Sequence, residues 1–460
     1  MQGSGTIPHP DGAMAAAVDD QDSAAAGKPE RVPFDAWWML FVLFLLYVVS
    51  LFDRLVLTML VEPIKADLQL TDVEMSIILG PAFAIFYGLF GWPLGWAADR
   101  YPRRWVIYLG VTFWSIAAAG SGFARSFTAL LLCRIGVGVG EASLTPSAYA
   151  LMGDKFPKRR LTTAMSLYQT GSMVGSASAF AIGGLAIGAA AHIAHISFPL
   201  VGQLHPWQIT LIVTGAPSIL LALLVFTFSE PPRRQAKPDA DPAARRNFLQ
   251  FAWAERQLLL PMAIGFSLMV IVGNSLVAWV PAYIARAFHL PPEHYGPILG
   301  VISIATGSTM VLKGWIVDWL YARGMKDAHL RFYSWLVVAS LPTAVATFLV
   351  PDALWFLLLY GVLQVLVIQF VVYVAATVYL VTPSDLRAQT VAVFISIFSL
   401  IGNGLGPLFT AMITDYVFRD DAKIGMSLLV MSVISIPLAW ICLRIALNAV
   451  HAAMARQGGD

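Results

Sequence analysis

Residues 131–152, LLCRIGVGVGEASLTPSAYALM, place an arginine and a glutamate seven positions apart in an otherwise apolar run. At about 100° per residue, Arg134, Gly138, Glu141 and Thr145 fall on one face of a helix. Charges in an apolar helix are costly unless they face protein or water, so this face is predicted to line an interior cavity. The opposite face carries Gly and Ser and is suited to close packing against another helix.

A second charged pair, Asp53 and Arg54, lies within the apolar run of about residues 36–61. Counted at about 1.5 Å per residue from the predicted outer ends, Asp53 lies roughly 12 Å deep and Arg134 roughly 10 Å, so we expect them to pair. Glu141 lies deeper, where burial makes a carboxyl group easier to protonate, as proton coupling requires. Glu141 and Asp53 are therefore the predicted proton-coupling residues, with Arg54 and Arg134 beside them. The alternative is a purely structural ion-pair network.

The composition places these charges in a membrane protein. Hydrophobic residues make up 58% of the 460-residue chain and charged residues only 12%, about half the share of a soluble domain. Apolar runs begin near residues 36, 76, 104, 127, 161, 207, 257, 295, 332, 353, 387 and 425, which predicts about twelve transmembrane helices. Motifs for ATP hydrolysis, esterase chemistry or paired-cysteine metal binding are missing from the sequence, so we expect no enzyme activity, no cofactor and no metal.

A polar, proline-rich linker divides the chain into two sets of six helices. The predicted organisation is a disordered cytosolic tail at 1–34, an N-terminal half at 35–228, a cytosolic linker at 229–255, a C-terminal half at 256–448 and a cytosolic tail at 449–460. If both termini are cytosolic, most lysines and arginines of the loops lie on the cytosolic side, as the positive-inside rule requires. The sequence therefore predicts that both termini are cytosolic. Repeated six-helix halves are typical of alternating-access transporters, whose substrate site lies near the membrane midplane between the halves.

The inner end of the second span carries the pattern G-x-x-x-D-R-x-x-R-R. Its members are Gly95, Asp99, Arg100, Arg103 and Arg104. Glycine allows a neighbouring helix to approach closely, and Asp99 is suited to pair with a basic residue when an inner gate closes. A partial copy at Gly314 and Asp318 ends the eighth span, so gating is predicted for these residues. The alternative is that the basic residues only fix the topology.

The second half has few charges within its spans. Lys313, next to Gly314, is an exception, and it is expected to reach the membrane surface or pair with Asp318. The polar candidates for the cavity are Asn274, Gln364, Gln369, Tyr373, Tyr379 and Asn403. For each of them, a helix–helix hydrogen bond is favoured over a ligand contact. A cavity with charges on one wall and apolar residues on the other favours an amphipathic molecule.

These motifs resemble a known family. The G-x-x-x-D-R loop resembles that of the major facilitator superfamily, and FDR (52–54), ADRYPRRW (98–105), FWS (113–115) and RIGVGVGEAS (134–143) together resemble the spinster family. The resemblance implies an all-α membrane protein with twelve helices in two six-helix pseudo-repeats, and transport of lysolipids or sphingolipid phosphates. It also implies proton coupling through the first- and fourth-span acids. Pro102 and Arg103 depart from the superfamily pattern, and the fifth-span Gly-Pro pair of drug antiporters is missing.

The sequence thus predicts a secondary transporter of an anionic amphipathic lipid, such as a lysophospholipid or a sphingosine-1-phosphate-like molecule, that is coupled to protons. We expect a multi-pass monomer in the plasma (inner) membrane if the source is bacterial, in contact with membrane lipids and not with nucleic acid. The alternative is a proton-coupled symporter or antiporter of small organic anions or drugs. A channel is disfavoured because the second half lacks a continuous polar stripe. The predicted cavity contacts for the substrate are Arg54, Arg134, Thr145, Asn274 and Tyr373.

Overall fold

The computed structural model is almost entirely helical. It describes residues 32–192, 197–198, 202–232, 248–325, 327–368, 373–374, 377–378, 382 and 386–457. In these residues, 11 helices are long and apolar enough to cross a membrane, and Ala353–Val367 is a shorter apolar helix. Their starts agree with the predicted apolar runs, so the all-helical membrane fold is confirmed.

The first half contains α2 to α11 together with four short 3-10 or extended pieces. Its elements are α2 Phe34–Met59, α3 Val61–Leu68, α4 Asp72–Leu79, α5 Pro81–Arg100, α6 Arg103–Gly120, η1 Ser121–Phe123, α7 Phe127–Glu141, α8 Leu144–Lys155, α9 Lys158–Ala191, β1 Ser197–Phe198, β2 Gly202–Gln203, α10 Pro206–Gly215, α11 Pro217–Ala222 and η2 Leu223–Thr227. The two short strands pair antiparallel.

The second half follows the linker. Its elements are α12 Phe248–Ala254, α13 Arg256–Phe288, α14 Pro292–Ala322, α15 Ala328–Leu349, α16 Ala353–Val367, α18 Arg387–Phe398, η4 Ser399–Asn403, α19 Gly404–Met412, η5 Ile413–Phe418, η6 Asp421–Lys423 and α20 Ile424–Gln457. The predicted linker therefore contains a helix, α12, and α20 runs on into the predicted C-terminal tail. The predicted N-terminal tail falls outside the described residues except for its last three.

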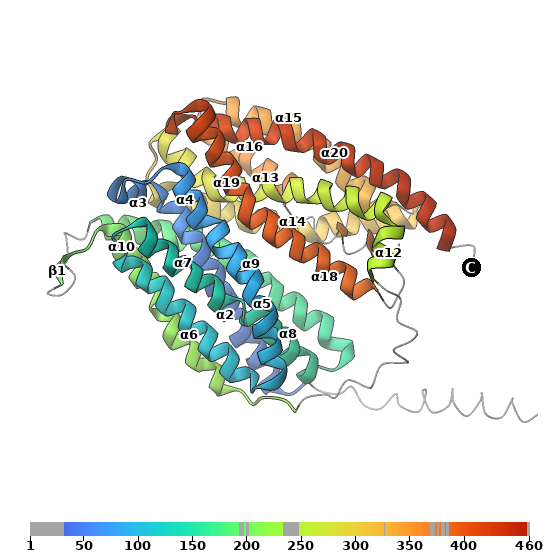
Figure 1. Cartoon of the computed structure of the whole chain (residues 1–460), viewed down its shortest axis with the longest axis horizontal. Coiled ribbons are helices and arrows are strands. Elements are labelled where there is room, and N and C mark those ends of the chain that lie inside the picture. The colour runs from blue at the N-terminus through green and yellow to red at the C-terminus, as the bar shows by residue number, and fades with distance from the viewer. Residues whose placement is uncertain are drawn as a thin grey trace, which may run out of the picture.

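The two halves meet at the end that carries α3 and α4 and diverge toward α8 and α18 (Figure 1). One buried cluster lies within the first half and includes Met39, Trp114 and Tyr168. A second cluster joins the core of the second half to residues at the α3 end of the first half, including Leu60 and Ile78. The halves therefore share a hydrophobic core at one end only.

Glycines show where the halves touch. A Cβ on Gly184 of α9 would lie 2.5 Å from the carbonyl oxygen of Pro292, and one on Gly296 of α14 would lie 2.4 Å from that of Phe180. Only glycine fits where two helix backbones approach this closely. Farther along α14, a Cβ on Gly314 would meet nothing within 4 Å. The contact between the halves thus ends before the predicted inner end of α14.

The fourth and tenth spans are interrupted at the same distance from their starts. The helices α7 and α16 each contain 15 residues. At about 1.5 Å per residue such a helix is roughly 22 Å long, shorter than the ~30 Å hydrocarbon core of a bilayer. The fourth span continues through Ala142 and Ser143, whose backbones stay helical, into α8, whereas α16 ends in the extended backbone of Ile368. Interrupted helices of this kind often frame binding sites in transporters.

Candidate functional site

Glu141 is the last residue of α7, and it pairs with an arginine of α2. Its Oε2 atom accepts hydrogen bonds from Arg54 Nη2 at 2.5 Å and from the Ser50 hydroxyl at 2.8 Å. The Glu141 side chain is 1% exposed, whereas that of Arg54 is 25% exposed. The other carboxylate oxygen of Glu141, Oε1, is buried without a hydrogen-bond partner. Glu141 is thus enclosed, while the side chain of its cation partner is partly exposed.

Arg54 also contacts aromatic rings. Its guanidinium carbon lies 4.0 Å from the centre of the Phe83 ring and 5.8 Å from that of Tyr87, both on α5. Such cation–π contacts stabilise a cation that is partly removed from water. The sequence predicted a cation beside Glu141, and the contact is made by Arg54 of α2.

Asp53 and Arg134 are neighbours, as predicted, but their contact is different. Arg134 Nη1 donates to the backbone carbonyl oxygen of Asp53 at 3.5 Å. The Asp53 carboxyl group is surrounded by Glu141, Arg134, Trp114 and Ser218, yet neither of its oxygens has a hydrogen-bond partner. The predicted carboxylate–guanidinium pair is therefore replaced by a looser arrangement, because Arg134 reaches the backbone of α2.

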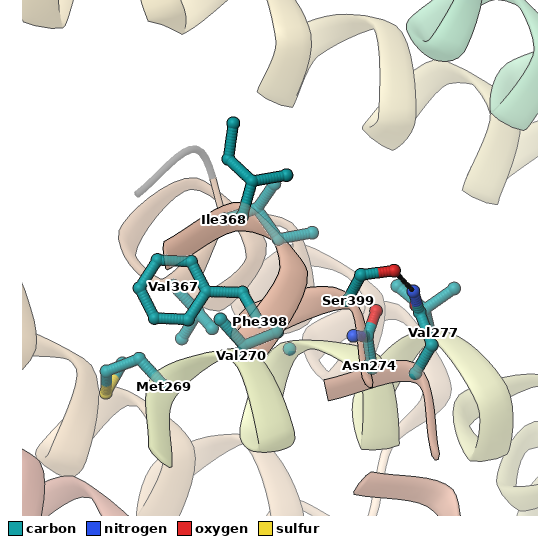
Figure 2. A pocket seen from close by; sticks show the side chains of 11 residues that line it. Met269, Val270, Asn274, Val277, Val367, Ile368, Phe398 and Ser399 are labelled. Atoms are coloured by element: carbon teal, nitrogen blue, oxygen red, sulfur yellow. Dashed lines mark hydrogen bonds between the residues drawn. The ribbon is translucent and has the colours of Figure 1, made fainter. Parts of the chain in front are cut away.

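The second half supplies an apolar pocket of about 290 Å³. Its walls come from α13, the end of α16, α18 and η4, and it is lined by Met269, Val270, Gly273, Asn274, Val277, Val367, Ile368, Ile395, Phe398, Ser399 and Asn403. Figure 2 shows the apolar side chains of Val270, Phe398 and Ile368 on one side and the polar groups of Asn274 and Ser399 on the other. Asn403 Nδ2 donates to the Ser399 hydroxyl at 3.4 Å. Asn274 was predicted to face the cavity, and it does line this pocket.

One turn of α5 contacts both walls. A Cβ on Gly80 would lie 2.7 Å from the carbonyl oxygen of Asn403, and one on Gly404 would lie 3.7 Å from Ala84 Cβ. The ring of Phe83, in the same turn, contacts the Arg54 guanidinium. The start of α5 therefore packs between Arg54 and the η4 wall of the pocket.

Other predicted cavity residues have different surroundings. Thr145 is half-buried and faces Tyr168. Tyr373 is 3% exposed and stacks on Tyr333 with ring centres 5.2 Å apart. It belongs to the aromatic core and does not line the pocket described above. Gln364 donates to the Tyr360 hydroxyl of its own helix, α16, rather than to another helix as predicted. Gln369 and Tyr379 lie outside the described residues.

The predicted gating residues lie at the end where the halves diverge. Asp99, Arg100 and Asp318 are exposed, and a Cβ on Gly95 would lie 3.9 Å from Pro146 Cβ. Arg103 pairs with Asp154, and its backbone N–H donates to Glu230 at 2.7 Å. Arg104 lies 3.6 Å from Glu230 and donates to the Phe228 carbonyl oxygen at 3.0 Å. These two arginines thus bind groups of their own half and the start of the linker.

The opposite end carries an ion-pair network that sequence reasoning missed, here termed the latch and formed by Glu62, Lys65, Asp72, Arg286 and Asp421. Arg286 of α13 donates two hydrogen bonds of 2.7 Å to Asp72 and one of 2.8 Å to Glu62. Lys65 binds Asp72 within its own half and Asp421 of the other half at 2.7 Å. In the latch, each half therefore supplies a cation that binds a carboxylate of the other half.

A further polar contact lies beside the latch. The backbone N–H of Val73 donates to Asp415 of η5 at 2.8 Å. In the sequence, the available signal for these contacts was the presence of charged residues at the ends of apolar helices. Loop charges of this kind are common, however, and only the tertiary structure pairs them.

Comparison with known proteins agrees with this architecture. The model of the Major Facilitator Superfamily matches residues 43–407. The chain belongs to the Major Facilitator Superfamily. As a superfamily member it is a multi-pass integral membrane transport protein and not an enzyme, which confirms those predictions.

The relatives within the superfamily differ in what they carry. An MFS-type efflux pump of Mycolicibacterium smegmatis is 29% identical over 88% of this chain and 89% of its own length. A probable L-galactonate transporter of Escherichia coli is 26% identical over 68% of each chain. Protein spinster homolog 1 of Xenopus tropicalis is 24% identical over 83% of this chain and 73% of its own length. The predicted likeness to spinster proteins is thereby confirmed.

A solved structure shows the same superfamily fold. A bacterial homolog of the human lysosomal transporter Spinster, in an inward-facing and unoccupied conformation, superposes with a TM-score of 0.76 at 24% identity. The match covers 92% of this chain and 98% of that one. This likeness supports the fold that was predicted from the sequence, two six-helix halves.

Proposed function

We propose that this superfamily member is a proton-coupled transporter of an amphipathic anion, a lysophospholipid or a sphingosine-1-phosphate-like lipid. The observation that carries the proposal is the juxtaposition of a reachable cation with an apolar pocket. Arg54 is 25% exposed beside a buried glutamate, and the pocket across α5 is mostly apolar. An anionic head group would bind Arg54, because a charged group needs a partner. Part of an acyl chain would fill the pocket, because apolar chains bind in sites that exclude water.

The geometry supports a coupling scheme centred on Glu141. Its unpartnered Oε1 is the atom on which a proton would reside. A protonated Glu141 keeps its Ser50 contact but holds Arg54 less strongly, because the ion pair becomes a neutral hydrogen bond. Arg54 then becomes available to the substrate anion. Protonation of Glu141 and binding of the substrate would in this way be coupled through Arg54.

The two ends of the molecule support alternating access. The latch closes the end that carries α3, which is extracellular in the predicted topology, while the predicted inner ends diverge. A transport cycle would break the latch and bring Asp99 and its neighbours against the other half. The gating role of Gly95, Asp99, Arg100, Arg103, Arg104 and Asp318 remains part of this proposal.

A small organic anion is the second candidate. It is favoured by relatives named as a probable L-galactonate transporter and a hexuronate transporter. Arg54 would bind the carboxylate of such a substrate, but the apolar pocket would then have no role.

Native mass spectrometry of the protein purified in a mild detergent discriminates the two candidates. Bound lysolipid supports the lipid proposal, and a bound sugar acid with no lysolipid contradicts it. Flux into proteoliposomes of a fluorescent lysophospholipid and of radiolabelled galactonate provides the functional counterpart. An imposed proton gradient should accelerate lysophospholipid flux and leave galactonate flux at the level of empty vesicles.

A further inference from the structure

The second half contains a buried cation that the scheme above does not use. Lys313 of α14 is 6% exposed, and its Nζ donates to the backbone carbonyl oxygen of Val365 in α16. The repeated Gly-Trp-x-x-Asp pattern does not account for this lysine, because the position before Gly95 in the first copy is Leu94. A role shared by the two copies therefore cannot explain the charge.

The acceptor of Lys313 is an end group of an interrupted helix. The helix α16 ends at Val367, where Ile368 adopts an extended backbone and its N–H donates to Gln364. The last four carbonyl groups of a helix lack the donors of a following turn. At membrane depth water does not supply them, so another part of the protein must. Lys313 supplies a donor and places a positive charge at the negative end of the helix dipole.

The residues beyond this contact form a wall of the pocket. Val367 and Ile368 follow Val365 directly, and both line the pocket beside Gly273. A Cβ on Gly273 would lie 3.4 Å from Val367 and 3.9 Å from Ile368. The position of the α16 end therefore determines the width of the pocket at Gly273.

We propose that Lys313 is a positioning residue that fixes the end of α16 and so sets the shape of the apolar pocket. The proposal rests on the proposed function only in taking that pocket as the site of the substrate chain. Lys313 holds the wall through the Val365 carbonyl and does not bind the substrate itself. Loss of the cation frees the end of α16 to move.

The test uses a local readout that needs no substrate. In a Cys133→Ser, Cys442→Ser background, Ile368→Cys reports on the α16 wall and Ser399→Cys on the η4 wall of the same pocket. Adding Lys313→Met should raise the maleimide labelling rate at position 368 about tenfold and leave that at position 399 unchanged. Lys313→Arg should keep the parent rate. Lys313→Gln, which can donate but is uncharged, should give an intermediate rate and replaces the Met variant if that variant does not fold.

Transport provides the second readout. Lys313→Met should raise the KM for the fluorescent lysophospholipid about tenfold while kcat stays within twofold, and Lys313→Arg should restore KM. Equal labelling at position 368 in the Met, Gln and parent proteins would overturn the positioning role. Failure of the parent to transport the lipid would instead contradict the proposed function. The labelling result would still decide the role of Lys313.

Discussion

Arg54 Nη2 lies 2.5 Å from Glu141 Oε2, and the same guanidinium covers the ring of Phe83 at 4.0 Å. The pair joins the first span to the C-terminal end of α7 in the fourth span. Because Glu141 is enclosed and contacts Arg54 directly, a change in the charge of Glu141 acts first on Arg54, whose side chain is partly exposed. This relationship is the basis of the first prediction.

Glu141→Gln should remove the response of transport to a proton gradient while leaving substrate binding largely intact. Glutamine retains the shape and the acceptor for Ser50 but cannot titrate. Flux in proteoliposomes with and without the gradient measures the effect. Glu74→Gln is the matched control, because Glu74 belongs to the capping box of α4 and glutamine can serve in that motif. A Glu141→Gln variant that responds like the parent would make Glu141 structural and Asp53 the coupling candidate.

Asp53 and Arg134 should depend on each other for stability. Each is buried within the first half and lies in the electrostatic field of the other, so neutralising one removes part of the compensation of the other charge. Asp53→Asn and Arg134→Gln should each lower the unfolding temperature in detergent, and the double variant should recover part of the loss. A double variant with a loss equal to the sum of the two single losses would show that the side chains are not coupled.

Breaking the latch should open the α3 end. Arg286→Gln removes the contacts to Glu62 and Asp72 and leaves a buried carboxylate without its main partner. Spin labels at Ala66→Cys and Ala287→Cys, two exposed alanines on α3 and α13, should show a longer and broader distance distribution than in the parent. Arg286→Lys, which keeps the charge, should shift the distribution less. An unchanged distribution in the Arg286→Gln variant would mean that apolar contacts alone close this end.

Asp99→Ala should weaken the predicted inner gate. The population should move further toward the state with diverged inner ends, and affinity in the competent state should change less than about twofold, since Asp99 lies outside the pocket. Spin labels at Tyr101→Cys on the first half and Gln389→Cys on the second report the opening. A collapse of substrate affinity with unchanged label distances would contradict a gating role.

Filling the pocket at Gly273 should select against long chains. Gly273→Ala, Gly273→Val and Gly273→Leu add increasing volume toward Val367 and Ile368. If the Leu variant displaces two methylene groups of the substrate, the loss is about 1.6 kcal/mol, or more than tenfold in affinity. The KM for a long-chain lysophospholipid should rise along the series, and the KM for a short-chain analogue should stay nearly constant. Equal effects on both lipids would place the chain elsewhere.

Much of the fold followed from local properties of the sequence. Apolar runs that are long enough to cross a bilayer must form helices there, because a membrane offers no water to unpaired backbone groups. The predicted starts of the spans therefore agree with the structure. The sequence also indicated that Asp53, Arg54, Arg134 and Glu141 lie inside the protein, since their charges are too costly in lipid.

The choice of partners depended on the tertiary structure. Helical periodicity placed Arg134 and Glu141 on one face, but Arg54 of another helix is the residue that reaches Glu141, because α2 passes the C-terminal end of α7. The latch and the Lys313–Val365 contact join residues that are far apart in the chain. Such pairings depend on how helices tilt and pack, and these angles are set by the summed contacts of many side chains rather than by any one segment.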